Sequence, residues 1–577
     1  MDGPNYVDLV MEDFKSPSGP CGKILGGDTG DDGAFGFLAR QYKICQETHV
    51  KCQKATNSPY LPSRVIDVGI DGDSQVALRT SKELDASHPY LTLSHCWGGS
   101  QPLKLTVDTV SRLKCGIMIA DLPKTFREAV LVTRKLGFRY LWIDSLCIYQ
   151  DSVDDWQAEA GHMSDIYGRA ACCIAATAST DSDSGLFRYR TSYPPLVGCD
   201  SFPRPPFKIS VERPKAPALE DMPPPGMYWC SIWWPDKYEL IDDAPLNRRA
   251  WVAQERYLST RVMHFTKDLL FWECLEVLSN EASGHGMPDI GSGLDDSEMN
   301  IFKMNFRNAR HHQPALQFGP GISCTLPKAS NLDFSLWYSF VQSYTLCSIT
   351  KEDDYLVALS GITREIELMT GDRFVAGLWE QELPEGLCWI ACSNQDGTLP
   401  VRSSRPTVWR APTWSWASVT DSISTLSDQT DGMTSAVDIL ECLVDKHPSG
   451  QVISAEITLR CRVIPIELHW KVYTGWARWE LVGDYDGNVI PTYSLFFDDL
   501  SFMATRTTEP FGAHLIILRD NGRELFHALL IVRSQRHEDA FERIGLLAYY
   551  RFDNNNAKTR ELRKLLDEAE PETIKLV

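Results

Sequence analysis

The sequence has no excess of basic residues and no long apolar run. Lys and Arg number 57 against 77 Asp and Glu, which gives a net charge of −20. Because such a chain repels phosphate backbones and anionic lipid, we expect neither nucleic acid nor a membrane as a partner. No stretch reaches the about 18 consecutive apolar residues of a membrane-spanning helix. With no basic and apolar export signal near Met1 either, we expect a soluble, cytoplasmic protein.

The common signatures of cofactor and metal chemistry are also missing. We find no P-loop, HExxH, GxSxG, EF-hand or Rossmann glycine motif in a fitting context. The glycines between Lys23 and Gly36 alternate with aspartates, whose carboxylates would repel a phosphate. We therefore expect no bound cofactor.

The length and the apolar content indicate several folded domains. The chain has 577 residues, of which 43% are hydrophobic and 10% aromatic, enough for large cores. Its 17 cysteines are odd in number and dispersed, which favours reduced thiols and a cytosolic setting. We predict a flexible leader (1–40), an N-terminal extension (41–89), an α/β domain (90–256), a mainly helical middle region (257–420) and a β-rich C-terminal domain (421–577).

Short apolar strands alternate with helical periodicity from Tyr90 onwards. Strands are expected at 90–94, 140–144 and 171–176, and helices at 121–136 and 152–167. Parallel strands joined by covering helices close most naturally as an open, flavodoxin-like parallel sheet.

In such a sheet, ligands bind at the carboxyl ends of the strands. The loops that follow the first two strands supply the expected pocket residues Ser94, Trp97, Gly98 and Asp144. Glu159, on the next helix, is the candidate catalytic carboxylate. Alternatively, it pairs with His162 or simply faces water.

Two further clusters have structural as well as functional interpretations. The Arg249, Glu255 and Arg256 cluster is either an ion-paired clasp or an anion site. His95 and Cys96 could form a thiol nucleophile and its base, but neighbours on an extended strand point to opposite faces, which favours structural roles.

Cys45, His49 and Cys52 provide three soft metal ligands within about two helical turns. A zinc ion would need a fourth ligand, and only Cys21 is conceivable nearby. We therefore interpret the trio as buried side chains, and a metal site as the alternative.

The order of these motifs resembles the fungal heterokaryon incompatibility (HET) domain family. The motifs that carry the resemblance are Tyr90 to Gly98, Leu122 to Phe126, Leu136 to Gln150, Asp155-Trp156, Glu159, Met163, Ile166 to Ala170, Arg249 to Trp251 and Gln254 to Arg256. Long family members are also similar in the flanks, at Cys45, His49, Cys52, Leu61 to Arg64, Ala358 to Gly361, Ala376 to Trp379 and Pro412 to Trp416.

The resemblance implies a role in non-self recognition and cell death in filamentous fungi. The family is considered a remote relative of TIR domains, which are flavodoxin-like, and some of these cleave the nicotinamide glycosidic bond of NAD with a glutamate. Glu159 resembles that glutamate in position, so that NAD is a possible substrate. The alternative implied function is a non-catalytic signalling scaffold that self-associates or docks an incompatibility partner protein.

Overall fold

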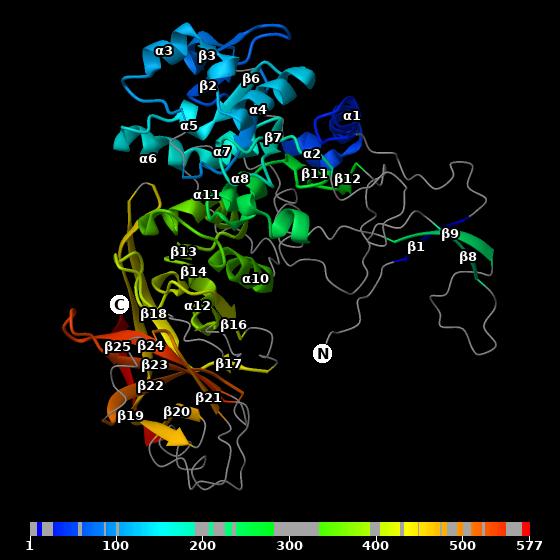
Figure 1. Ribbon diagram of the computed structural model, residues 1–577. Coiled ribbons are helices and arrows are strands. Elements are labelled where there is room, and N and C mark those ends of the chain that lie inside the picture. The colour runs from blue at the N-terminus through cyan, green and yellow to red at the C-terminus, as the bar shows by residue number, and fades with distance from the viewer. Residues whose placement is uncertain are drawn as a thin grey trace. The chain divides into compact units, whose positions relative to one another are not determined.

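The structure is a computed structural model of the chain (Figure 1), and its described residues divide into two compact units, Met1–Asp295 and Asp296–Val577. The residues that it describes are 9–13, 27–55, 60–85, 88–99, 103–190, 207–211, 226–232, 238–281, 334–392, 404–426, 432–447, 449–473, 476–481, 493–499, 509–521, 526–549 and 568–577. Within these ranges, every helix is too short or too polar to cross a bilayer.

A nine-stranded mixed sheet forms the centre of the first unit, in the order β12-β11-β10-β7-β4-β6-β2-β3-β5. In chain order, its strands are β2 (Arg64–Asp67), β3 (Gln75–Thr80), β4 (Tyr90–Ser94), β5 (Ile117–Met118), β6 (Tyr140–Ile143), β7 (Cys172–Ala175), β10 (Arg261–Phe265), β11 (Leu270–Cys274) and β12 (Leu278–Asn280).

The four central strands are parallel. β4 pairs with β6 on one side and with β7 on the other, and β10 extends the parallel core beyond β7. Numbered along the chain, these strands follow the order 2-1-3-4, as in flavodoxin-like sheets. The predicted α/β fold is confirmed, and antiparallel strands extend it at both edges. The topological switch point, where ligands bind in such sheets, lies between β4 and β7.

The strands of the parallel core are connected through short helices. These are α3 (Val110–Cys115), α4 (Lys124–Lys135), α5 (Asp144–Cys147), α6 (Val153–Gly161), α7 (Met163–Gly168) and α8 (Val252–Tyr257). α4 is amphipathic and buries Phe126, Ala129 and Val130. The Ser152 side chain caps α6. The expected single helix at 152–167 is divided at His162, whose ψ of 0° interrupts the helix.

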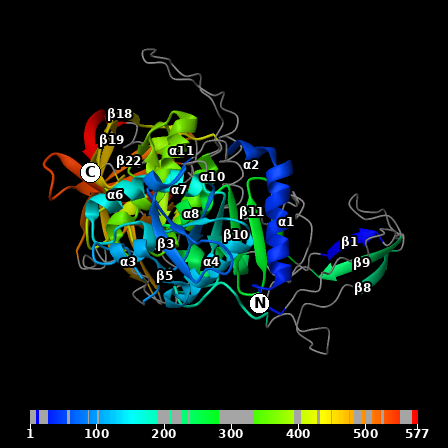
Figure 2. The ribbon, with the colours of Figure 1, turned by 90° about the horizontal axis from the view of Figure 1, so that it is seen from above.

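The first unit extends beyond the predicted limits of the α/β domain on both sides. α1 (Asp32–Thr48) begins inside the predicted leader because Phe37, Leu38 and Cys45 give it a buried face. It lies beside β11 (Figure 2), and α2 (Val50–Ala55) follows it. β10, β11 and β12 lie after the predicted end at residue 256 and yet belong to the same sheet. Only long-range pairing reveals this membership.

A separate three-stranded sheet and several short helical turns complete the first unit. The sheet has the order β1-β9-β8, with β1 (Leu9–Asp13), β8 (Phe207–Val211) and β9 (Gly226–Ile232). The turns are 3₁₀ segments at Ser81–Glu83, Ile119–Asp121 and Pro245–Arg248 and a π segment at Tyr238–Asp242.

The second unit combines helices with β-strands, as predicted. Its helices are α10 (Phe334–Thr345), α11 (Ser360–Thr370) and α12 (Leu383–Gly386), with 3₁₀ turns at Glu352–Asp354, Val357–Leu359, Glu380–Glu382 and Trp416–Ser418. Two short pairs are formed by β13 (Phe374–Val375) with β14 (Leu378–Trp379) and by β15 (Trp389–Ala391) with β16 (Ile423–Thr425). The remaining strands form the β-rich part: β17 (Thr434–Ser435), β18 (Asp438–Lys446), β19 (Val452–Tyr473), β20 (Trp476–Leu481), β21 (Tyr493–Phe497), β22 (Phe511–Asp520), β23 (Phe526–Arg533), β24 (Ala540–Tyr549) and β25 (Pro571–Leu576).

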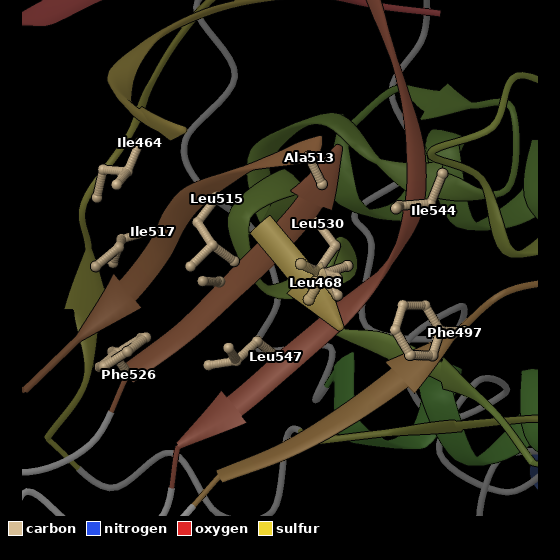
Figure 3. Close-up of a cluster of buried hydrophobic side chains, with 11 residues drawn as sticks. Ile464, Leu468, Phe497, Ala513, Leu515, Ile517, Phe526, Leu530, Ile544 and Leu547 are labelled. Carbon is tan, nitrogen blue, oxygen red and sulfur yellow. The ribbon is translucent and has the colours of Figure 1, made fainter. Parts of the chain in front are cut away.

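These C-terminal strands enclose their own apolar core. Pairing runs from β22 through β23, β24 and β25 to β19, and β19 pairs again with β22. Alternate side chains such as Leu515, Leu530 and Leu547 point into the enclosed space (Figure 3). The β-rich C-terminal region is thereby confirmed.

Candidate functional site at the carboxyl ends of the parallel strands

The loops after β4 and β6 meet at one edge of the sheet. Leu93 in β4 lies opposite Ile143 in β6, so Ser94 and Asp144 follow at neighbouring positions. Trp97 Nε1 donates a hydrogen bond to Asp144 Oδ2 at 2.8 Å, which joins the two loops. The predicted convergence of these loops is confirmed.

Gly98 shapes the turn that brings Trp97 to Asp144. Its φ is +72°, and a Cβ at this position would lie 2.3 Å from the Cβ of Asp181. Only glycine allows both the left-handed backbone and the close approach of the loop after β7. Gly98 therefore has a structural role at the site edge.

His95 lies beneath these loops as a neutral, buried imidazole. Burial lowers the pKa of His95 to about 4, a shift that Asp144 opposes. Its Nδ1 is 3.7 Å from Asp144 Oδ1, and neither ring nitrogen has a hydrogen-bond partner among the described residues. Burial also raises the pKa of the Cys96 thiol, which disfavours the thiolate that a Cys96 nucleophile would need.

Glu255 is the buried carboxyl group of this cluster. It extends from α8 and accepts a hydrogen bond from the hydroxyl of Ser94, the last residue of β4. Burial raises the pKa of Glu255 to about 7, and nearby Arg249 partly opposes this shift. Burial therefore favours the protonated form of Glu255 more than in an exposed glutamate. Arg249 itself donates a hydrogen bond to the backbone oxygen of His95.

The predicted cluster of Arg249, Glu255 and Arg256 divides between two places. Whereas Arg249 and Glu255 lie at the end of β4, Arg256 forms ion pairs with Asp242 at 2.7 Å and with Glu273 at 2.9 Å. Successive helical residues point about 100° apart, which separates Glu255 from Arg256. Arg256 is thus an ion-paired clasp, one of the two interpretations of the sequence.

Glu159 belongs to a different cluster, around Arg64 at the start of β2. Arg64 donates to both oxygens of Asp155, at 2.8 and 2.7 Å, and lies 3.2 Å from Glu159 Oε1. Burial raises the pKa of Glu159, while a hydrogen bond from Ser63 and the Arg64 charge oppose the shift. Within the described ranges, no hydrogen bond or ion pair links Glu159 to Ser94, Trp97 or Asp144. Glu159 is buried and forms its ion pair with Arg64, and no ion pair with His162 is found among the described residues.

Comparison with known families identifies the α/β part of the chain. Residues 90–255 match the family described as heterokaryon incompatibility protein (HET). The chain contains a HET domain. No curated protein and no solved structure matches the chain. The matched range begins at the first residue of β4 and ends at Glu255, so it includes every residue of the cluster at the strand edge.

The HET match covers residues 90–255, and other candidate functional residues lie outside it. Arg64, the partner of Asp155 and Glu159, lies outside the HET domain, as does β10, the fourth parallel strand. The family motif could have indicated Glu255, because Gln254 to Arg256 is part of it, but its neighbour Ser94 lies 161 residues earlier.

A second group of possible ligands also lies outside the HET domain. Cys45, His49 and Cys52 are joined by Cys274, the last residue of β11. All four are buried, and their ligand atoms lie within 4.8 Å of one another. Cys21, the conceivable fourth ligand, is outside the described residues. Cys274 was not predicted as a ligand, because a lone cysteine at the end of an apolar strand does not show the sequence spacing of a metal-binding motif.

Proposed function

We propose that the HET domain acts in incompatibility by hydrolysing the nicotinamide glycosidic bond of NAD at the carboxyl edge of β4 and β6. The observation that supports this function best is the buried Glu255 carboxyl, which has a pKa raised to about 7 and accepts a hydrogen bond from the Ser94 hydroxyl. A strongly perturbed acid at the end of β4, a strand that borders the topological switch point, is typical of a ligand-binding or catalytic site.

The chemistry requires a fixed negative charge next to the sugar. As the bond from the ribose carbon to the pyridinium nitrogen breaks, its electron pair neutralises the ring, and positive charge develops on the ribose. Ionised Glu255 would stabilise this charge, and Ser94 would orient its carboxylate. A water oxygen then bonds to the ribose carbon, and the water's proton passes to Glu255 or to solvent.

The less buried residues provide the side from which the substrate would approach. Trp97, Asp144 and Arg249 are partly exposed, whereas Ser94 and Glu255 are buried. The Arg249 guanidinium suits a phosphate oxygen, and the Trp97 ring suits a planar base. The cluster thus offers one group for each part of a dinucleotide.

The resemblance to TIR domains implies a different catalytic carboxylate, Glu159. Its carboxylate is held in an ion pair with Arg64, which also bonds Asp155. We therefore assign the catalytic carboxylate to Glu255 and a structural role to Glu159.

The test is nicotinamide release from NAD by the purified full-length chain. We expect Glu255→Gln to lower the rate by about 100-fold, since one preorganised charge contributes roughly this much, and Glu159→Gln to keep most of it. The matched control is Glu281→Gln, which removes another buried carboxylate, paired with Arg190, after β12 and four strands from β4. Thermal unfolding confirms that each variant is folded.

Equal release by the wild type and Glu255→Gln would contradict the assignment of Glu255. If only Glu159→Gln abolished release, the catalytic carboxylate would be Glu159. A chain that releases no nicotinamide and yet kills cells on overexpression would act as the non-catalytic scaffold instead, and loss of killing when self-association is blocked would identify that function.

A further inference from the structure

Cys45, His49, Cys52 and Cys274 form a compact, buried group of four metal-ligating side chains. Cys45 and His49 are one helical turn apart at the end of α1, and Cys52 follows on α2. Cys274 comes from the end of β11, which lies beside α1. Since 225 residues separate His49 from Cys274, only the fold brings the fourth ligand to the other three.

The dimensions of this group suit a tetrahedral ion. All four ligand atoms lie within 4.8 Å of one another, and His49 Nδ1 is 3.4 Å from Cys274 Sγ. Zinc bonds of about 2.3 Å to sulfur and about 2.0 Å to nitrogen place tetrahedral ligand atoms about 3.5–3.8 Å apart. A small inward movement of the side chains would bring all four to these separations.

Arg261 supplies the charge and hydrogen bonding that such a centre needs. Zn²⁺ with three thiolates and a neutral imidazole carries one net negative charge. Arg261 is buried, and its Nε lies 3.1 Å from Cys45 Sγ, as a donor to that sulfur. Its other nitrogens donate to the backbone oxygens of Ala171 and Cys52. Hydrogen bonds of this kind orient metal ligands and stabilise thiolate charge.

We propose that Cys45, His49, Cys52 and Cys274 bind one structural Zn²⁺ ion. Four protein ligands leave no open coordination position, which is typical of structural and not catalytic zinc. The ion would join α1 and α2, which precede the HET domain, to β11, which follows it. It would thereby connect the segments that precede and follow the HET domain at one edge of the sheet.

The test is the metal content of the purified full-length chain, measured by elemental mass spectrometry after dialysis. We expect about one equivalent of zinc per wild-type chain. Cys274→Ser should lose it, whereas His49→Cys should retain it because a fourth thiolate replaces the imidazole. The matched control is Cys461→Ser, which removes a comparably buried thiol from β19 in the second unit and should keep its zinc.

A second measurement covers the case in which Cys274→Ser does not fold. The wild-type chain loaded with Co²⁺ should show the visible absorption of a tetrahedral site together with sulfur-to-cobalt charge transfer. A wild-type chain without zinc, or equal zinc in the wild type and a folded Cys274→Ser, would overturn the proposal. Absence of both cobalt bands would overturn it as well.

Discussion

Two buried glutamates of the first unit, Glu159 and Glu255, differ in what faces them. Both are 4% exposed. A guanidinium lies 3.2 Å from Glu159 and also holds Asp155. Glu255 instead accepts a hydrogen bond from Ser94, and no cation forms an ion pair with it among the described residues.

This difference indicates a structural role for the carboxylate of Glu159, whereas the carboxyl of Glu255 is not held by an ion pair among the described residues. The charge of Glu159 joins α6 to β2 through Arg64, so that substituting it would disturb packing. The carboxyl of Glu255 has a raised pKa, because burial opposes its ionisation more than Arg249 favours it. Burial alone would not distinguish the two residues.

The largest effect on stability is expected from Arg64→Ala. It leaves Asp155 and Glu159 without their shared cation, and an uncompensated buried charge costs about 3 kcal/mol of unfolding free energy. Adding Glu159→Gln to this variant should restore part of the loss, since it removes one of the two charges. Denaturant titration, with Arg64→Lys as the charge-conserving control, measures both effects. A loss below about 1 kcal/mol, as for an exposed pair, would show that the cluster does not hold α6 to β2.

A pH-dependent effect of comparable size should distinguish Glu255. Its pKa is raised from 4.5 to about 7 in the folded state. The folded state therefore binds more protons between these values, and this group's contribution to stability falls as the pH rises through 7, by about 3 kcal/mol in total. Glu255→Gln should match the wild type near pH 4.5 and be the more stable protein at pH 8. Thermal unfolding across this range measures the difference.

Parallel behaviour of the wild type and Glu255→Gln at all pH values would contradict the raised pKa. Glu281→Gln is again the suitable control, because burial raises the pKa of Glu281 as well, against an ion pair with Arg190. The difference in stability between Glu281→Gln and the wild type should vary less with pH, because the Arg190 charge compensates ionised Glu281.

The sequence predicted those parts of the fold that depend on local pattern. β4, α4, β6 and β7 lie where apolar periodicity and turn residues placed them, and the convergence of Trp97 with Asp144 followed from the parallel order. The missed features all depend on pairing between distant segments. Arg64 meets Glu159 across 95 residues and Ser94 meets Glu255 across 161. No local signal shows which of several charged or polar side chains a fold will bring together.

The smallest effect is expected from Ser94→Ala. The Ser94 hydroxyl donates to the Glu255 carboxylate and so lowers the pKa of Glu255. Removing this donor should cost about 1 kcal/mol, the usual net value of one hydrogen bond, and should raise the pKa of Glu255 further. The midpoint of the pH dependence of stability should then move above that of the wild type, while Thr92→Ala, on the same strand, leaves the midpoint unchanged. A midpoint that moved down or stayed in place would show that the Ser94 hydroxyl does not stabilise the ionised form of Glu255.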